Sequence, residues 1–190
     1  MNGTQIGTAT KFAPNAKKVL VDIDKSELNE ENKVKIDCKI NLDLNNFVKI
    51  FEKSSKKIKI EKMWYKVISH WKIKYPTVQK KYFQEKQYTN PYVFFHKLSK
   101  FTKKNDIIIP DASANLVWFY QAFKPKKNQK IFTALNHSPM GYSFAAAIGA
   151  AVSLNSKKEI IAIIGDGSVQ MNIQEIENIK NYKLPIKMFI

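Results

Sequence analysis

Asp166 stands between two glycines, Gly165 and Gly167, directly after the apolar stretch "EIIAII". Glycines allow a tight turn and a close approach of the backbone to a ligand, and Ser168 could cap a helix that begins there. Amide hydrogens at the start of such a helix favour an anion, but the carboxylate would repel a bare phosphate. A Mg²⁺ ion between carboxylate and phosphate resolves this conflict, because Mg²⁺ prefers one or two carboxylates together with phosphate oxygens. The stretch therefore predicts Asp166 as a metal ligand and its neighbours as phosphate-binding residues.

Other interpretations of Gly-Asp-Gly exist. The three residues alone are typical of a common turn. The stretch lacks the third glycine of a dinucleotide-binding fingerprint, the Gly-Lys-Ser/Thr of a P-loop and the alternating acidic residues of an EF-hand. Its position between a buried strand and a helix favours the metal site over the turn.

The elements around this stretch alternate after Asn90. Apolar runs predict strands at 106–110, 130–135, 159–165 and 185–190, and helical spacing predicts helices at 91–101, 115–123, 142–154 and 169–182. Alternating strands and helices predict an α/β fold with a mainly parallel sheet and helices on both faces. Ligands of such sheets bind beyond the carboxyl ends of the strands, which is where Asp166 lies.

The first part of the chain has a different organisation. It predicts strands at 17–24 and 33–40 and a helix at 41–55 with Asn41 or Asp43 as its N-cap. These elements are too few to bury their own faces, so residues 1–53 are expected to be the tail of a second α/β domain. Residues 54–89 are expected to form a partly helical linker, and residues 90–190 the ligand-binding domain.

The segment "GDGSVQMNIQEIENIKNYKLPIKMFI" resembles the cofactor motif of the thiamine diphosphate-dependent enzymes, and within them the acetolactate synthases. The resemblance implies a thiamine diphosphate-binding fold in which Asp166 binds Mg²⁺ and Gly165, Gly167 and Ser168 bind the cofactor. The family motif closes with an asparagine, and the chain ends at Ile190 just before that position. This metal ligand is therefore expected to be missing, and the binding domain to be incomplete at its C-terminus.

A second match is "NHSPMGYSFAAAIGAA", which is similar to the family segment that starts Met-Gly-Tyr/Phe. In the family the methionine packs under the cofactor and bends it, a role that falls on Met140, and Gly141 follows it. An unbranched, polarizable side chain suits this packing. The residue two positions earlier offers a backbone carbonyl to the aminopyrimidine ring; here it is Ser138, where the family has glycine.

A third match is "IIIPDASANLVW", which lies where relatives have an Asp-Val-Gly-Gln-His-Gln-like turn against the diphosphate. The resemblance implies that Ser113 and Asn115 donate hydrogen bonds to the cofactor, while Ala114 replaces the glutamine. Met171 could also face the cofactor, but its helical spacing fits core packing equally well.

The N-terminal "TKFAPNAKKVLVDIDKSEL" resembles the end of the middle domain of acetolactate synthases, which can hold FAD. The matching stretch is too short to support a flavin site, so FAD stays possible but unsupported.

The resemblance implies an activity as well: decarboxylation of pyruvate or another 2-oxoacid and carboligation to a second 2-oxoacid, a reaction of branched-chain amino acid biosynthesis. The family's catalytic glutamate comes from another domain, normally of the partner subunit in a homodimer or homotetramer. Glu175 and Glu177 lie on the wrong helix to replace it. We therefore expect no catalytic residue in this chain and little turnover by the chain alone. Another thiamine diphosphate-dependent decarboxylase or carboligase is the alternative.

Composition bears on the partners and the compartment. A formal net charge of +16 is compatible with a nucleic-acid-binding module, but all 32 basic residues are lysines and they are spread along the chain. A solvated surface without specific nucleic-acid binding is therefore the favoured interpretation. With a single cysteine, Cys38, no apolar run long enough for a membrane span and no secretion signal in the first residues, we expect no membrane association and a cytoplasmic location.

Overall fold

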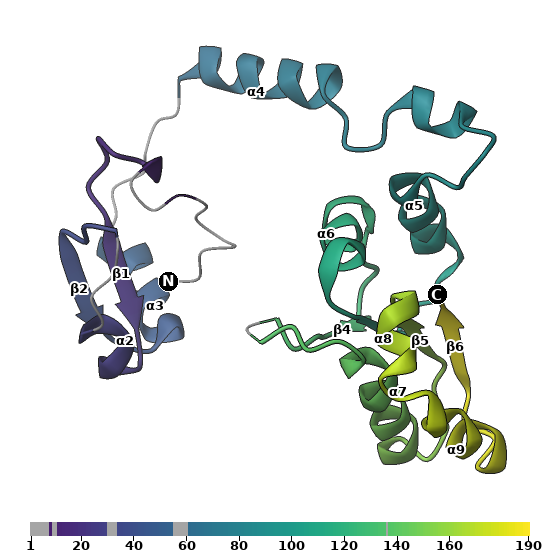
Figure 1. Cartoon of the computed structure of the whole chain (residues 1–190). Coiled ribbons are helices and arrows are strands. Elements are labelled where there is room, and N and C mark those ends of the chain that lie inside the picture. Colours follow the sequence, from purple (N-terminus) through teal and green to yellow (C-terminus); the bar gives the residue numbers. More distant parts are fainter. Residues whose placement is uncertain (1–7, 9–10, 30–33, 55–60, 136) are drawn as a thin grey trace. The chain divides into compact units, whose positions relative to one another are not determined.

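The computed structural model describes residues 8, 11–29, 34–54, 61–135 and 137–190. The chain divides into two compact units, residues 1–65 and 66–190, and each is described here by itself (Figure 1). The division falls within α4, inside the stretch expected to link two domains. None of the helices formed by the described residues is both long and apolar enough to span a bilayer.

The described residues of the first unit include a parallel two-stranded sheet and the helices beside it in sequence. Its elements are β1 (Val19–Asp22), α2 (Lys25–Asn29), β2 (Cys38–Asn41) and α3 (Leu44–Ser54). The Oδ1 atom of Asp43 accepts hydrogen bonds from the N–H groups of Asn45 and Asn46, at 3.0 and 3.2 Å. This confirms an N-cap at Asp43. No described side chain of α3 is buried, as expected for a unit with too few elements to cover it.

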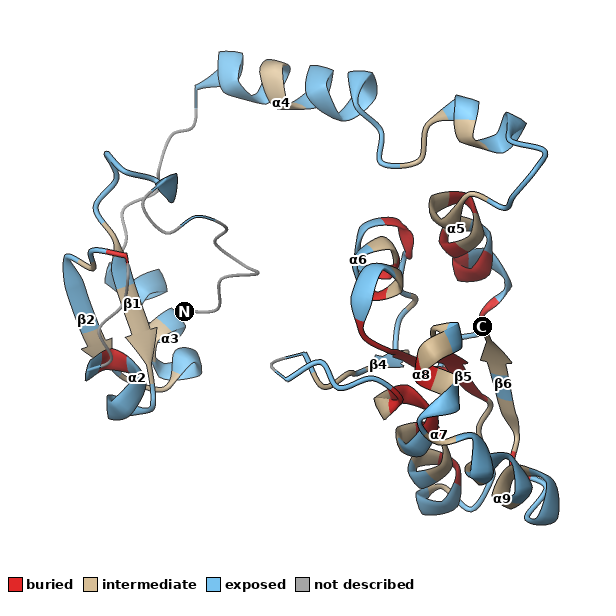
Figure 2. Cartoon of the chain, viewed as in Figure 1, coloured by how far each residue is buried: buried red, intermediate tan, exposed pale blue. Residues whose placement is uncertain are grey.

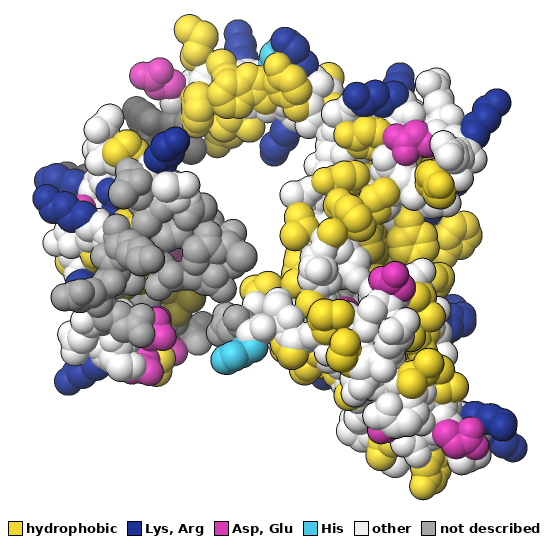
Figure 3. Space-filling model, viewed as in Figure 1, with side chains coloured by type: hydrophobic (Ala, Val, Ile, Leu, Met, Phe, Trp, Pro, Cys, Tyr) yellow, Lys and Arg dark blue, Asp and Glu magenta, His cyan; other side chains and the backbone are white. Residues whose placement is uncertain are grey.

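Residues 61–90 form one helix and a short 3₁₀ turn. Helix α4 (Lys62–Lys74) ends just before the expected stop at Pro76, and the 3₁₀ helix η2 covers Lys80–Gln84. Large hydrophobic side chains of α4 are well exposed, and Figure 3 shows hydrophobic side chains along this helix. The helix contains no buried residue.

The second unit is built on a four-stranded parallel sheet with the strand order β4-β3-β5-β6. Its strands are β3 (Ile107–Pro110), β4 (Lys130–Ile131), β5 (Ile160–Ile163) and β6 (Ile186–Phe189). Every residue of the two central strands, β3 and β5, is buried (Figure 2). The predicted α/β class with a parallel sheet is therefore confirmed.

Helices cover both faces of this sheet. They are α5 (Pro91–Phe101), α6 (Ser113–Ala122), α7 (Tyr142–Ser153) and α9 (Ile176–Asn181). Helix α8 (Asp166–Gln170) and the 3₁₀ helix η3 (Ile173–Glu175) connect β5 to α9. Ile108 and Ile161 pack with side chains of α5 and α6 on one face. Ile107 and Ile160 pack with α7 and α9 on the other. The alternation of side chains along a strand thus builds two separate cores on one sheet.

Several predicted elements differ from the structure. In the first unit, the strand predicted at 33–40 is confined to β2, since residues 34–37 are not in a strand. The predicted strand at 130–135 is shortened to β4, which pairs only with β3 at the edge of the sheet. The predicted helix at 169–182 is broken into α8, η3 and α9. The break lies at Asn172, whose backbone (φ −135°, ψ 29°) is not helical and whose side chain donates a hydrogen bond to the Gly141 carbonyl. A tertiary contact therefore overrides the helical pattern here.

Candidate functional site

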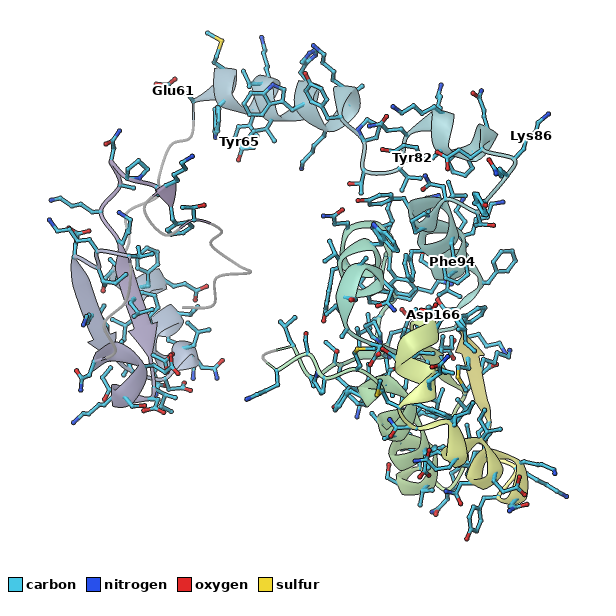
Figure 4. The ribbon with its side chains drawn as sticks, in the orientation of Figure 1. Glu61, Tyr65, Tyr82, Lys86, Phe94 and Asp166 are labelled. Atoms are coloured by element: carbon cyan, nitrogen blue, oxygen red, sulfur yellow. The ribbon has the colours of Figure 1, made fainter. Side chains whose placement is uncertain are left out.

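Asp166 lies at the start of α8, just beyond the carboxyl end of β5 (Figure 4). Its side chain is exposed, while Gly165 before it is extended (φ −78°, ψ 157°) and turns the chain from strand to helix. The expected position at the carboxyl edge of the sheet is therefore confirmed. Ser168 was expected to cap the helix, and this is wrong: the helix begins two residues earlier, and Ser168 is buried within it.

The carboxylate of Asp166 is held by its own turn. Its Oδ1 atom accepts a hydrogen bond of 2.8 Å from the N–H of Gly167. The described residues contain no group of three or more His, Cys, Asp or Glu side chains that could hold a metal ion by themselves. A lone exposed carboxylate suits a cation that takes its remaining ligands from phosphate and water, which is the usual coordination of Mg²⁺.

Met140 lies against the Gly-Asp-Gly turn although it belongs to the segment before α7. A Cβ built on Gly167 would lie 3.3 Å from the Cε atom of Met140, so the glycine makes room for this side chain. Met140 is nevertheless 52% exposed. The structure thus brings together two residues that the sequence assigned to the same cofactor, and leaves the methionine free on its outer side.

Asn115 approaches the same turn from α6. Its Nδ2 atom lies 4.0 Å from the position of a Cβ on Gly165, and Ser168 Oγ lies 3.8 Å from that position. The Oδ1 atom of Asn115 is buried and has no hydrogen-bond partner. Buried polar atoms are usually satisfied, so an unpaired one at the edge of a candidate site is an available contact for a ligand.

A cavity of about 230 Å³ adjoins this corner of the site. Asn115 supplies a polar side chain to its wall, which also includes Ile163 at the end of β5 and Ile164 directly after it. The rest of the wall is mainly aromatic and includes Phe94 of α5, which is labelled in Figure 4. The site residues therefore border an apolar space at the carboxyl end of the sheet.

Ser113 and Ser138 both adopt the left-handed backbone region, with φ of 69° and 44°. This region costs a residue with a side chain roughly 1–2 kcal/mol, whereas glycine enters it freely. Both serines are exposed, and no described contact joins Ser138 to the Gly-Asp-Gly turn. Met171 is 58% exposed at the end of α8, so packing in the core is not its role.

Two residues of the site were not assigned a role from the sequence. Asp111 follows β3 and is fully buried; its carboxylate accepts hydrogen bonds from the N–H groups of Gly141 and Ser143, at 3.1 and 3.0 Å. Asn172 donates a hydrogen bond of 3.0 Å to the carbonyl of Gly141. A carboxylate placed directly after a wholly apolar strand was the available signal for Asp111; for Asn172 the sequence offered none beyond its place in the motif.

Three observations fit a magnesium-bound diphosphate cofactor at this edge. They are the exposed Asp166 carboxylate, the close approach of Met140 to Gly167 and the unpaired Oδ1 atom of Asn115. Asp166 begins α8, Asn115 lies in the first turn of α6, and Met140 lies in the segment before α7. The arrangement can therefore bind an anion through a cation and can support an apolar ring beside it.

Comparison with known proteins identifies relatives for the chain. Residues 111–190 match the family "Thiamine pyrophosphate enzyme, C-terminal TPP binding domain", thiamine pyrophosphate being another name for thiamine diphosphate. The chain is 32% identical over 187 residues to acetolactate synthase 1, chloroplastic, of Nicotiana tabacum, which covers 97% of this chain and 27% of the relative. It is 30% identical to acetolactate synthase 2, chloroplastic, of Zea mays, again over 97% of this chain and 29% of the relative.

A bacterial protein gives the same picture. The acetolactate synthase isozyme 1 large subunit of Escherichia coli is 26% identical over 97% of this chain and 32% of its own length. The chain thus spans about a third or less of the curated relatives that it matches. Residues 111–190 thus match the model of C-terminal thiamine diphosphate-binding domains, and the chain is similar to a part of the acetolactate synthases.

Proposed function

We propose that this chain binds thiamine diphosphate through a Mg²⁺ ion held by Asp166, as part of an acetolactate synthase-like enzyme. The observation that supports the proposal most strongly is the position of Asp166, exposed at the carboxyl end of β5. Ligands of open parallel sheets bind at this edge. The same turn carries Gly167, which Met140 approaches closely.

Each residue of the site has a part in the proposed binding. Asp166 binds the cation, while Gly165 and Gly167 let the backbone approach the diphosphate. Asn115 and Ser113 provide polar groups from the start of α6. Met140 supports the rings from below, Ser138 offers its carbonyl to the aminopyrimidine, and Gly141, Ser168 and Met171 complete the wall.

The proposed reaction belongs to the complete protein. Thiamine diphosphate, when bound, supplies the carbon centre on which a 2-oxoacid such as pyruvate loses carbon dioxide and is joined to a second 2-oxoacid. This chain's residues orient the cofactor and exclude water from one side of it. The glutamate that activates the cofactor is proposed to come from another domain in a homo-oligomer.

Calorimetric titration of the chain with thiamine diphosphate, with and without Mg²⁺, tests the binding. The sharpest variant is Asp166→Asn, because the amide oxygen can still accept the 2.8 Å hydrogen bond from Gly167 while the negative charge is lost. We expect the wild-type chain to bind only with Mg²⁺, and Asp166→Asn to bind at least about tenfold more weakly.

Asp43→Asn is the matched control. It removes the same charge at the N-cap of α3 in the other unit, where asparagine caps as well as aspartate. It should bind the cofactor like the wild-type chain. Equal affinity of Asp166→Asn and the wild-type chain in the presence of Mg²⁺ would refute the metal role of Asp166.

A further inference from the structure

Gly141 is held by side chains on both sides of its backbone. The N–H of Gly141 donates a 3.1 Å hydrogen bond to Asp111 Oδ2, and its carbonyl accepts one of 3.0 Å from Asn172 Nδ2. Asp111 follows β3, and Asn172 follows α8. Side chains from two parts of the chain that are distant in sequence therefore hydrogen-bond to the backbone of the same residue.

The backbone conformation of Gly141 requires glycine at this position. Its φ of +85° lies in the left-handed region, and it precedes α7 as the N-cap without a side chain of its own. A Cβ on Gly141 would lie 2.5 Å from Asn172 Nδ2 and 3.1 Å from the Ser168 carbonyl. Only glycine therefore fits between α8 and the start of α7 in this conformation.

Asp111 does more than cap a helix. One of its oxygens accepts the N–H of Ser143 in the first turn of α7, which replaces the missing cap. The other oxygen is used outside the helix, on Gly141 itself. Asp111 is fully buried, and its described partners are backbone N–H groups, so the carboxylate is committed to these two bonds.

Met140 is the residue directly before Gly141. Its side chain is half exposed, so core packing does not hold it, yet its Cε atom reaches the surface of Gly167. The main-chain position of Met140 therefore depends on the backbone of the residue that it precedes. That backbone is fixed by Asp111 and Asn172.

We infer that Asp111 and Asn172 are positioning residues: together they clamp Gly141 and thereby hold Met140 against Gly167. The importance of this clamp for cofactor binding rests on the proposed function, whereas the clamp itself does not. Asp111 and Asn172 need no contact with the cofactor for this role. They act on Met140 only through the backbone of Gly141.

The test uses the complete 190-residue chain with ¹³C-methyl-labelled methionine and no cofactor. The methyl resonance of Met140 is assigned with Met140→Leu, and its nuclear Overhauser contact to the Hα protons of Gly167 is recorded. Asn172→Asp places a carboxylate against the Gly141 carbonyl, and Asn172→Leu removes the donor. Both variants should lose the contact, while the methyl resonance of Met188 on β6 keeps its position.

Asp111→Asn is the second arm, since an amide can accept only one of the two N–H groups and turns a donor toward the other. Its matched control is Asp106→Asn. Asp106 is also buried and also accepts a backbone N–H, that of Lys103, but it precedes β3 at the opposite end of the strand. The control should lose stability and keep the contact between Met140 and Gly167.

The outcomes separate the clamp from the proposed function. A retained Met140–Gly167 contact in both folded Asn172 variants overturns the clamp, even if Asp111→Asn does not fold. Titration with thiamine diphosphate and Mg²⁺ then measures its importance, with an expected loss of about tenfold in affinity for the Asn172 variants. If the wild-type chain binds no cofactor, the proposed function fails, and the methyl contact still decides whether the clamp exists.

Discussion

The Cε atom of Met140 lies 3.3 Å from the point at which a side chain on Gly167 would begin. The two residues belong to motifs on either side of α7 and β5, and the fold brings them into contact at the carboxyl edge of the sheet. A methyl group at this distance leaves no room for a second one without movement. The pair is therefore sensitive to the smallest possible change at Gly167.

Gly167→Ala should weaken cofactor binding more than it changes stability. The added methyl group pushes Met140 outward by a few tenths of an ångström, while alanine in α8 favours the helix by up to about 1 kcal/mol. Calorimetric titration with thiamine diphosphate and Mg²⁺ measures the affinity, and urea denaturation measures the free energy of unfolding. Affinity equal to that of the wild-type chain would show that Met140 has no fixed role.

Alanine at Gly141 and at Gly149 should change stability in opposite directions. Gly141→Ala forces a left-handed backbone and a 2.5 Å contact with Asn172, so the free energy of unfolding should fall by at least about 2 kcal/mol. Gly149 lies in the middle of α7 with open space around an added Cβ, so Gly149→Ala should raise it by about 0.5–1 kcal/mol. Urea denaturation of both variants checks the pair, and the same sign for both would contradict the structure.

Glycine should relieve the two strained serines. Ser113→Gly and Ser138→Gly remove the cost of roughly 1–2 kcal/mol that a residue with a side chain bears in the left-handed backbone region. The greater conformational entropy of glycine in the unfolded chain offsets part of this gain in stability. We expect each to raise the free energy of unfolding by about 0.5–1 kcal/mol. Ser153→Gly, within α7, is the control and should lower it by a similar amount. Destabilisation by Ser113→Gly or Ser138→Gly would mean that its hydroxyl is needed.

His96 should make the second unit less stable in acid. Burial lowers the pKa of His96 below its usual value, and the charges of Lys100 and Lys124 lower it further. The folded state thus binds fewer protons than the unfolded state, so its stability is complete above about pH 6.5 and declines as the pH falls through that value. His96 Nδ1 is also buried without a partner.

His96→Phe keeps an aromatic ring beside Phe83 and removes the titrating group. The loss of stability between pH 8 and pH 5, measured by urea denaturation, should be smaller in this variant than in the wild-type chain. His137→Gln, on an exposed segment, controls for the loss of any histidine. An unchanged pH dependence in His96→Phe would exclude His96 as the cause.

The helices and strands of the second unit could largely be predicted from the sequence, because their signals are local. Helix 91–101 was predicted to the residue because Pro91 suits a first helical position and Asn90 precedes it; the Asn90 side chain accepts the N–H of Tyr92 at 3.0 Å. The buried strands are continuous apolar runs, which is typical of parallel sheets. These signals are local, so a single sequence contains them.

The missed parts depend on contacts across the fold. Nothing in the neighbourhood of Asn172 indicates that its side chain reaches Gly141 and interrupts a helix. Likewise, the two hydrogen bonds of Asp111 go to residues some thirty positions later in the chain. The sequence identified Asp166, Gly167 and Met140 as one site through motif resemblance, and the residues that join these pieces became visible only in three dimensions.

The short length of β4 limits how strands of other molecules can pair with this edge of the sheet. A sheet edge invites hydrogen bonding by strands of other chains, and aggregation often starts there. Here the strand on that side is only Lys130–Ile131, and one of its two residues carries a positive charge. An incoming chain would gain very few backbone pairs and would meet a cation, so this border of the sheet is protected against runaway self-association.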